Sequence, residues 1–136
     1  MAKFDETDEK ILALLEAGEI RIQSISDRIG LSVGAVHNRI QKLKSAGMGY
    51  KIDFDYRPLG KLPVFLLLDI LYPFRKEIEN SLKRETNVKH MYRTTGPYNL
   101  IVFAVFDNVD QLREYALVTL GYDKRVRKVD ILEREK

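Results

Sequence analysis

Residues 22–46 read IQSISDRIGLSVGAVHNRIQKLKSA, a stretch that predicts two short helices joined by a tight turn. Gly30 is placed to end the first helix, because a residue without a Cβ adopts the left-handed conformation at low cost. Ser32 is placed to start the second helix, since its hydroxyl can accept hydrogen bonds from the free N–H groups of the first turn. In the second helix, apolar residues recur at helical spacing and form one stripe: Val36, Ile40 and Leu43.

The face opposite this stripe carries small, neutral-polar or basic side chains that can approach base edges or phosphates: Gly34, Asn38, Gln41, Lys42 and Ser45, with His37 beside them. No Asp or Glu occurs between Asp27 and Asp53. Five basic residues fall in the same region: Arg28, Arg39, Lys42, Lys44 and Lys51. This pattern is typical of a helix-turn-helix whose second helix enters a major groove of DNA. The alternative is a plain packing motif whose acid-free run is only a solvated face.

Composition bounds the class of protein. The chain has 136 residues, enough for one medium domain or two small ones, and a formal net charge of only +3. It has no Cys, which excludes disulfides and thiolate metal sites and suits a reducing compartment. No apolar run reaches the roughly 18 residues of a membrane span, and the acidic N-terminus does not resemble a signal peptide. We therefore expect a cytoplasmic protein without membrane contact, metal or cofactor.

The N-terminal part predicts a three-helix unit over residues 1–49. Asp5, Glu6 and Asp8 suit the first turn of a helix because acidic side chains interact favourably with the helix dipole there. Gly18 is placed to end this helix. Residues 50–54, YKIDF, alternate in polarity and predict a strand. We assign residues 50–61 to this linking strand and a hinge.

Residues 62–136 predict a second domain with the order strand, helix, strand, strand, helix, strand. These elements are expected at residues 63–71, 74–86, 88–95, 99–106, 109–120 and 125–132. This β-α-β-β-α-β order is the ferredoxin-like plan. The predicted fold class is therefore α+β, with an N-terminal helix-turn-helix domain of the winged type and a C-terminal ferredoxin-like domain.

The two most apolar strands, 63–71 and 99–106, fall in the middle of the sheet in this plan. A middle strand that is apolar on both faces needs cover on both faces, and two helices cover only one. A second copy of the sheet is the simplest cover for the other, which predicts a homodimer packed sheet to sheet. The alternative is that residues 1–54 of the same chain cover it.

The chain resembles the Lrp/AsnC family, the feast/famine transcription regulators of bacteria and archaea. The resemblance lies in FDETDEKILALLE (4–16), RIGLSVGAVHNRIQKL (28–43), HMYRTTGPYNLIVF (90–103) and LERE (132–135), and it covers essentially the whole chain. It implies a sequence-specific regulator of double-stranded DNA. The C-terminal domain would sense an amino acid or related metabolite and would pair as dimers that assemble further to tetramers or octamers.

By position, the resemblance implies a DNA-facing set of Ser32, Gly34, His37, Asn38, Arg39 and Lys42. Together with the outward face of the second helix, we expect His37, Asn38 and Gln41 nearest the bases, and Arg39, Lys42 and Lys44 nearer phosphate.

The family's sensing motif is a glycine turn followed by an acid, which reads Gly96-Pro97-Tyr98-Asn99 in this chain. An amide at position 99 can hydrogen-bond a ligand's ammonium group but cannot form an ion pair with it. The expected ligand set is Thr94, Thr95, Gly96, Tyr98 and Asn99. The outcomes left open are an altered ligand, a weaker one or none, and the alternative is a turn that only joins two strands.

Two other function classes compete. An enzyme related to haem-precursor decarboxylases would need His for acid–base work, but His37 lies on the outward face of the turn helix and His90 stands alone in an edge strand. No Ser-His-Asp spacing, glycine-rich phosphate loop or clustered metal ligands occur, so we predict that the chain is not an enzyme. The remaining class is a ligand-responsive partner that acts only by hetero-assembly with related regulators.

Overall fold

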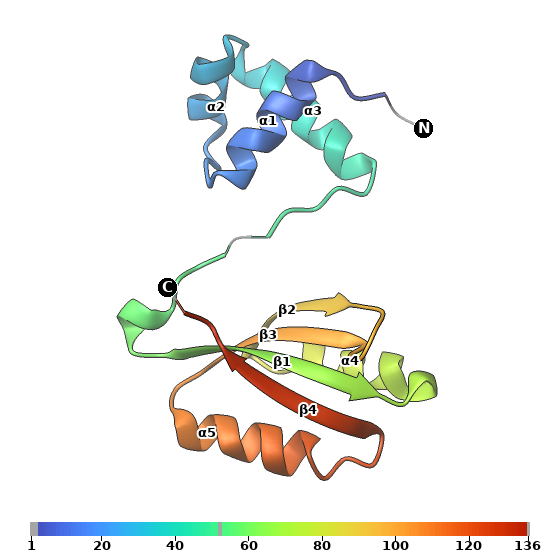
Figure 1. Ribbon diagram of the computed structural model, residues 1–136. Helices are drawn as coiled ribbons and strands as arrows, with labels where there is room; N and C mark the ends of the chain where they lie inside the picture. Colours follow the sequence, from blue (N-terminus) through green and yellow to red (C-terminus); the bar gives the residue numbers. More distant parts are fainter. Residues whose placement is uncertain (1–2, 52, 136) are drawn as a thin grey trace. The chain divides into compact units, whose positions relative to one another are not determined.

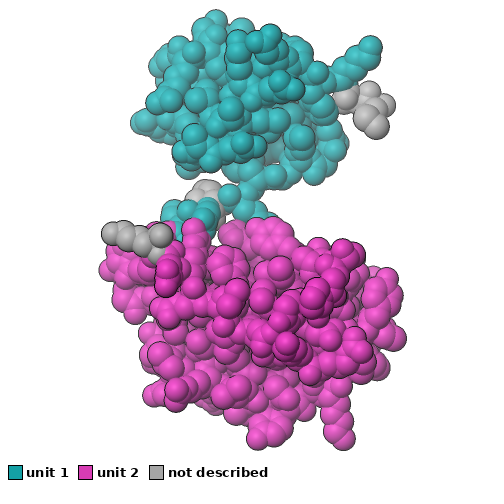
Figure 2. Space-filling model, in the orientation of Figure 1, with its two compact units in different colours: residues 1–54 teal, residues 55–136 magenta. Residues whose placement is uncertain are grey.

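The computed structural model describes residues 3–51 and 53–135, and it divides the chain into two compact units. Unit 1 comprises residues 1–54 and unit 2 residues 55–136, as Figure 2 shows in separate colours. Each unit has its own cluster of buried apolar side chains.

Unit 1 consists of three helices, α1 (Glu6–Glu16), α2 (Ile22–Ile29) and α3 (Val33–Ser45), as predicted (Figure 1). Asp5 caps α1 and forms a reciprocal capping box with Asp8, which satisfies two backbone N–H groups at the helix start. The unit's core is small: four buried aliphatic side chains, Ile11, Ile25, Val36 and Ile40, pack together in one cluster, and Leu43 is buried as well.

The turn between α2 and α3 follows the sequence prediction. Gly30 ends α2 in the left-handed conformation, with φ 80°. Ser32 caps α3 by accepting a hydrogen bond from the N–H of Ala35 over 3.1 Å. A further hydrogen bond across the turn is not apparent from the sequence: the hydroxyl of Ser26, a buried residue, donates to the carbonyl of Leu31. The stripe of Val36, Ile40 and Leu43 is buried.

The predicted linking strand does not form at residues 50, 51, 53 and 54, and the remaining position, 52, lies outside the described residues. An isolated strand leaves its backbone N–H and C=O groups without a ladder partner. Alternation of polarity alone therefore does not produce a strand here. A short helical turn, Arg57–Leu59, follows and ends at Gly60 with φ 72°.

Unit 2 has the predicted ferredoxin-like order. Its elements are β1 (Leu62–Ile70), a short turn at Tyr72–Phe74, α4 (Arg75–Lys83), β2 (Val88–Arg93), β3 (Leu100–Phe106), α5 (Val109–Arg113) with a π-helical continuation (Glu114–Leu120), and β4 (Val126–Glu133). The sheet order is β2-β3-β1-β4, with every neighbouring pair antiparallel. This confirms the prediction that the two most apolar strands lie in the middle.

The sheet has one covered face and one face that no helix of unit 2 covers. α4 and α5 with its continuation lie on the same side (Figure 1), where they pack against alternate strand residues: Val64, Leu66, Leu68, Ile70, Leu100, Val102, Ala104 and Phe106. The residues between them form the other side, which we call the open face. It includes Phe65, Leu67, Ile101 and Phe103 together with Leu132 of β4, which pairs with Phe65.

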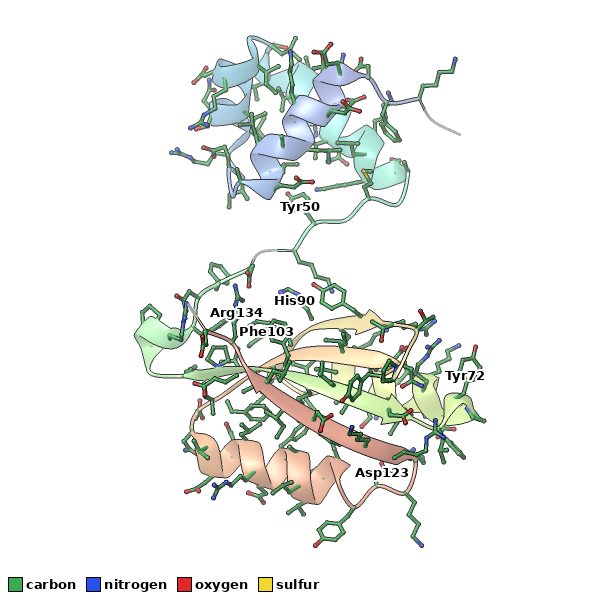
Figure 3. The ribbon with its side chains drawn as sticks, in the orientation of Figure 1. Tyr50, Tyr72, His90, Phe103, Asp123 and Arg134 are labelled. Carbon is green, nitrogen blue, oxygen red and sulfur yellow. The ribbon has the colours of Figure 1, made fainter. Side chains whose placement is uncertain are left out.

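Part of the open face is covered within unit 2. The Phe103 ring is only 3% exposed. It stacks on His90 with 5.9 Å between ring centroids, and the Arg134 guanidinium lies 5.2 Å from its centroid (Figure 3). By contrast, Leu132 is 54% exposed.

Several predicted boundaries are shifted. The helix expected at residues 74–86 is shorter and ends at Lys83, and the strand expected at 88–95 ends at Arg93. No helix among the described residues combines the length and apolar character needed to cross a membrane.

Candidate nucleic-acid interface

The outward face of α3 presents three polar side chains that make no hydrogen bond or ion pair with described residues of unit 1. His37, Asn38 and Gln41 are exposed, and no hydrogen bond or ion pair joins their side chains to other described residues. Asn38 and Gln41 project from the side opposite the buried stripe, with His37 beside them, because α3 turns by about 100° per residue. Their donors and acceptors are therefore available to an external partner such as base edges.

Arg39 has a different role from the one expected. Its Nη1 donates to Asp5 Oδ1 over 2.7 Å and to Asp8 Oδ1 over 3.0 Å, so the guanidinium joins α3 to the start of α1. A hydrogen bond from the N–H of Asp8, followed by the one from Arg39, lowers the pKa of Asp5 to about 2. The hydrogen bonds that the Arg39 guanidinium donates to Asp5 and to Asp8 raise the pKa of Arg39. Arg39 thus fixes the placement of α3 within unit 1.

The two lysines of α3 differ in their surroundings. Lys42 Nζ lies 3.6 Å from Asp8 Oδ2 and 5.2 Å from the centroid of the Phe4 ring. Lys44 has no acidic partner among the described residues and lies 5.8 Å from the centroid of the Tyr50 ring. Both side chains are exposed. Asp8 therefore partly compensates the positive charge of Lys42, whereas no carboxylate among the described residues compensates that of Lys44.

The start of α3 offers little side-chain bulk. Ser32 is exposed, but its hydroxyl oxygen already caps the helix. Gly34 is exposed, and a Cβ built on it would meet nothing within 4 Å. A glycine inside a helix costs about 1 kcal/mol relative to alanine, and here it leaves the first turn open to close approach.

Two residues hold the helix-turn-helix in place, and this role is not apparent from the sequence. Ser26 bonds across the turn, and Asp8 contacts α3. Asp8 is fully buried and receives the Asp5 N–H, Arg39 and Lys42. The spacing of Asp5 and Asp8 is a capping-box pattern, which could have identified the first of these contacts. Nothing in the local sequence identifies the partner on α3.

The glycine turn expected to hold an effector lies between β2 and β3. Gly96 adopts φ 117°, a left-handed value that favours glycine. Thr94 Oγ1 donates to the carbonyl of Tyr98 over 2.7 Å, and the Tyr98 hydroxyl donates to Asp130 on β4. The turn is therefore braced both within itself and against β4.

The side chain of Asn99 forms two hydrogen bonds with the backbone at the end of β1. Its Nδ2 donates to the carbonyl of Ile70 over 2.7 Å, and its Oδ1 accepts from the N–H of Ile70 over 2.9 Å. The side-chain amide therefore substitutes for a ladder partner at the end of β1. Both of its polar atoms are thus engaged with β1, and its role towards a ligand stays a prediction.

Comparisons with known proteins agree with this arrangement. Residues 4–48 match the winged helix-turn-helix DNA-binding family. An uncharacterized HTH-type transcriptional regulator of Pyrococcus furiosus is 30% identical over 125 residues, which cover 89% of this chain and 84% of that protein.

Solved structures share the fold. AsnC of E. coli superposes with a TM-score of 0.70 at 21% identity, covering 99% of this chain and 94% of that one. A transcriptional regulator of Neisseria meningitidis in complex with L-Met gives a TM-score of 0.73 at 24% identity, covering 98% of this chain and 91% of the other. With the helix-turn-helix and the ferredoxin-like domain described above, these likenesses show that the chain belongs to the Lrp/AsnC family of transcriptional regulators.

Proposed function

We propose that α3 reads DNA sequence through the side chains of His37, Asn38 and Gln41. The observation that carries this proposal is their exposure, without internal partners, on the face opposite the buried stripe. Lys44 and Lys42 would contact phosphate, while Ser32 and Gly34 let the start of the helix approach the duplex. Arg39 would act by holding α3 against α1.

The division of labour would follow the two units. Residues 1–49 would contact DNA, residues 50–61 would connect, and residues 62–136 would assemble and sense. Exposed apolar residues on the open face, Leu132 among them, support a homodimer packed through that face. A symmetric dimer would present its two α3 helices to successive major grooves, about 34 Å apart. Further association into tetramers or octamers would multiply the DNA sites held at once.

A small-molecule effector would bind near the Gly96 turn and change this association. The Neisseria regulator, which has the same fold, was solved with L-Met. In the present chain the turn residues available to a ligand are Thr95 and Gly96, because the Thr94 hydroxyl bonds the carbonyl of Tyr98 and the Tyr98 hydroxyl bonds Asp130. An effector that binds one assembly state more tightly than another shifts the population between them.

The test compares Asn38→Ala with Asn80→Ala, a matched change at an exposed asparagine of α4. Preferred duplexes are first selected by pulling down genomic fragments with the full chain. Binding to a preferred and a random duplex is then measured by fluorescence anisotropy over a range of salt concentrations. We expect Asn38→Ala to weaken the preferred site by about 1–3 kcal/mol and to leave random DNA almost unchanged.

Equal losses on preferred and random DNA would contradict a base-reading role for Asn38. A wild-type chain without salt-sensitive binding to any duplex would contradict the proposal as a whole. Asn80→Ala should match the wild type throughout.

A further inference from the structure

The start of α4 and the turn after β2 lie at the same end of unit 2 (Figure 1), which Tyr72 marks in Figure 3. A shallow hollow of about 520 Å³ at this end is lined by Arg75, Arg93, Thr94 and Thr95. Two of these residues carry guanidinium groups and two carry hydroxyls. No carboxylate lines the hollow.

Arg75 brings a positive charge that no carboxylate of the described residues pairs with directly, although, after the larger effect of the hydrogen bond from Arg93, the charge of Arg75 helps to lower the pKa of the Glu79 carboxyl. Its guanidinium lies 5.1 Å from the centroid of the Tyr72 ring, and among the described residues no carboxylate forms an ion pair with it. The side chain is half-buried at the first position of α4. An arginine held in this way has its N–H groups available to an acceptor from solution.

Arg93 is held in place by Glu79. Its Nε and Nη2 donate to the two carboxylate oxygens over 2.6 and 2.7 Å, a bidentate geometry that fixes the plane of the guanidinium. Glu79 is buried, whereas the Arg93 side chain is 57% exposed. A guanidinium has five N–H donors, and the described residues supply acceptors for only two of them here.

The neighbouring turn adds a donor and no negative charge. Thr94 uses its hydroxyl to bond the carbonyl of Tyr98, but Thr95 is exposed and its hydroxyl has no partner among the described residues. The amide of Asn99 is engaged with Ile70.

Glu79 compensates the charge of Arg93, so the net positive charge at the hollow comes from Arg75. A ligand's ammonium group would be repelled by it, whereas an oxyanion would meet the N–H groups of two guanidinium groups and the Thr95 hydroxyl.

We infer that Arg75, Arg93 and Thr95 form a binding site for a small oxyanion, either a dicarboxylate or a phosphate. The site lies beside the Gly96 turn, so this inference rests on the proposed function where it concerns regulation: the effector that controls assembly is an anion. Anion binding itself can be measured without DNA.

The test is isothermal titration calorimetry on the full chain at constant ionic strength. The titrants are succinate as the dicarboxylate, inorganic phosphate, neutral succinamide and zwitterionic L-methionine. We expect saturable binding of succinate or phosphate, and the anion that binds identifies the source of the negative charge. Succinamide and L-methionine should bind more weakly, since neither carries a net negative charge.

Arg75→Gln should weaken binding of the anion about tenfold, because it removes a charged hydrogen-bond donor. Arg113→Gln is the matched control, since Arg113 is exposed on α5 and has no ion-pair partner among the described residues. Thermal melting of both variants checks that they remain folded. Thr95→Val removes the hydroxyl donor without altering the charge of the site, and it should also weaken binding of the anion.

The inference is overturned if the wild type takes up neither anion saturably, if Arg75→Gln binds as tightly as the wild type, or if L-methionine binds more tightly than both anions. DNA binding without anion binding would remove only this inference. Anion binding in a chain that fails to bind DNA would leave the site standing and remove its regulatory role.

Discussion

Asp8 Oδ1 accepts a hydrogen bond from the Arg39 guanidinium over 3.0 Å, although the two residues lie 31 positions apart. Asp8 is fully buried, and its other carboxylate oxygen accepts the backbone N–H of Asp5 over 3.0 Å. One side chain therefore completes the start of α1 and holds the helix that we propose reads DNA.

Asp8→Ala should destabilise unit 1 by about 2–4 kcal/mol, because it removes the acceptor of the Asp5 N–H in the capping box and leaves Arg39 with one acceptor fewer. The measurement is urea unfolding followed by circular dichroism. Asp27→Ala, at an exposed residue of α2 bonded only to Gln23, should cost about 0.5 kcal/mol or less. Equal stability of the two variants would argue against the role given to Asp8.

Acid should weaken unit 1 through Asp5. Hydrogen bonds from the N–H of Asp8 and from Arg39 lower its pKa from the usual 3.8 to about 2, so the charged carboxylate is favoured in the folded state. The stabilisation is present above pH 4 and disappears as the pH falls towards 2. The difference in unfolding free energy between the wild type and Asp5→Asn should therefore shrink over this interval. A difference that does not change with pH would exclude this origin.

Lys44→Ala should reduce the slope of log K against log salt by about one unit, as expected when one phosphate contact is removed. Lys42→Ala should reduce it by less, because Asp8 already lies 3.6 Å from Lys42 Nζ. Both variants should weaken preferred and random duplexes to a similar extent. Salt titrations by fluorescence anisotropy measure the slopes, and the reverse ranking would show that Asp8 does not compensate Lys42.

Much of the fold could be predicted because its signals are local or periodic. The stripe of α3, the turn at Gly30 and the two apolar middle strands all depend on near neighbours in sequence. The contacts of Arg39 and Asn99 could not be predicted. The acceptors of Arg39 lie on another helix, and the partner of Asn99 is a β1 residue 29 positions away that depends on sheet register. The residues proposed to contact DNA and effector remain predictions.

Leu132→Glu should convert the proposed dimer into a monomer. Leu132 is 54% exposed on the open face, so a charge there disturbs a partner more than it disturbs the single chain. Burying one leucine at an interface contributes about 1.5–3 kcal/mol. Leu117→Glu is the matched control, because Leu117 is 60% exposed on the π-helical continuation of α5, which covers the opposite side of the sheet. Light scattering after gel filtration gives the masses, and a dimeric Leu132→Glu would place the interface elsewhere.

Asn99→Asp restores the acid of the family's motif but should destabilise unit 2 by about 1–3 kcal/mol at neutral pH. The reason is that a carboxylate oxygen would replace the Nδ2 donor facing the carbonyl of Ile70. Protonating the introduced carboxyl returns a donor, so the loss should diminish in acid. Asn108→Asp should be tolerated, since Asn108 caps α5 as an acceptor. Urea unfolding at pH 7 and pH 4 measures both variants.

The two buried clusters share no residue, so damage to one unit need not spread to the other. A chain in which only unit 1 has unfolded would keep its sheet and could still enter the proposed dimer with a wild-type chain. A mixed dimer with an Asp8→Ala chain would then hold only one folded unit 1, so the substitution would also reduce DNA binding by the wild-type chain in it. In a cell carrying both forms, such alleles would behave as dominant.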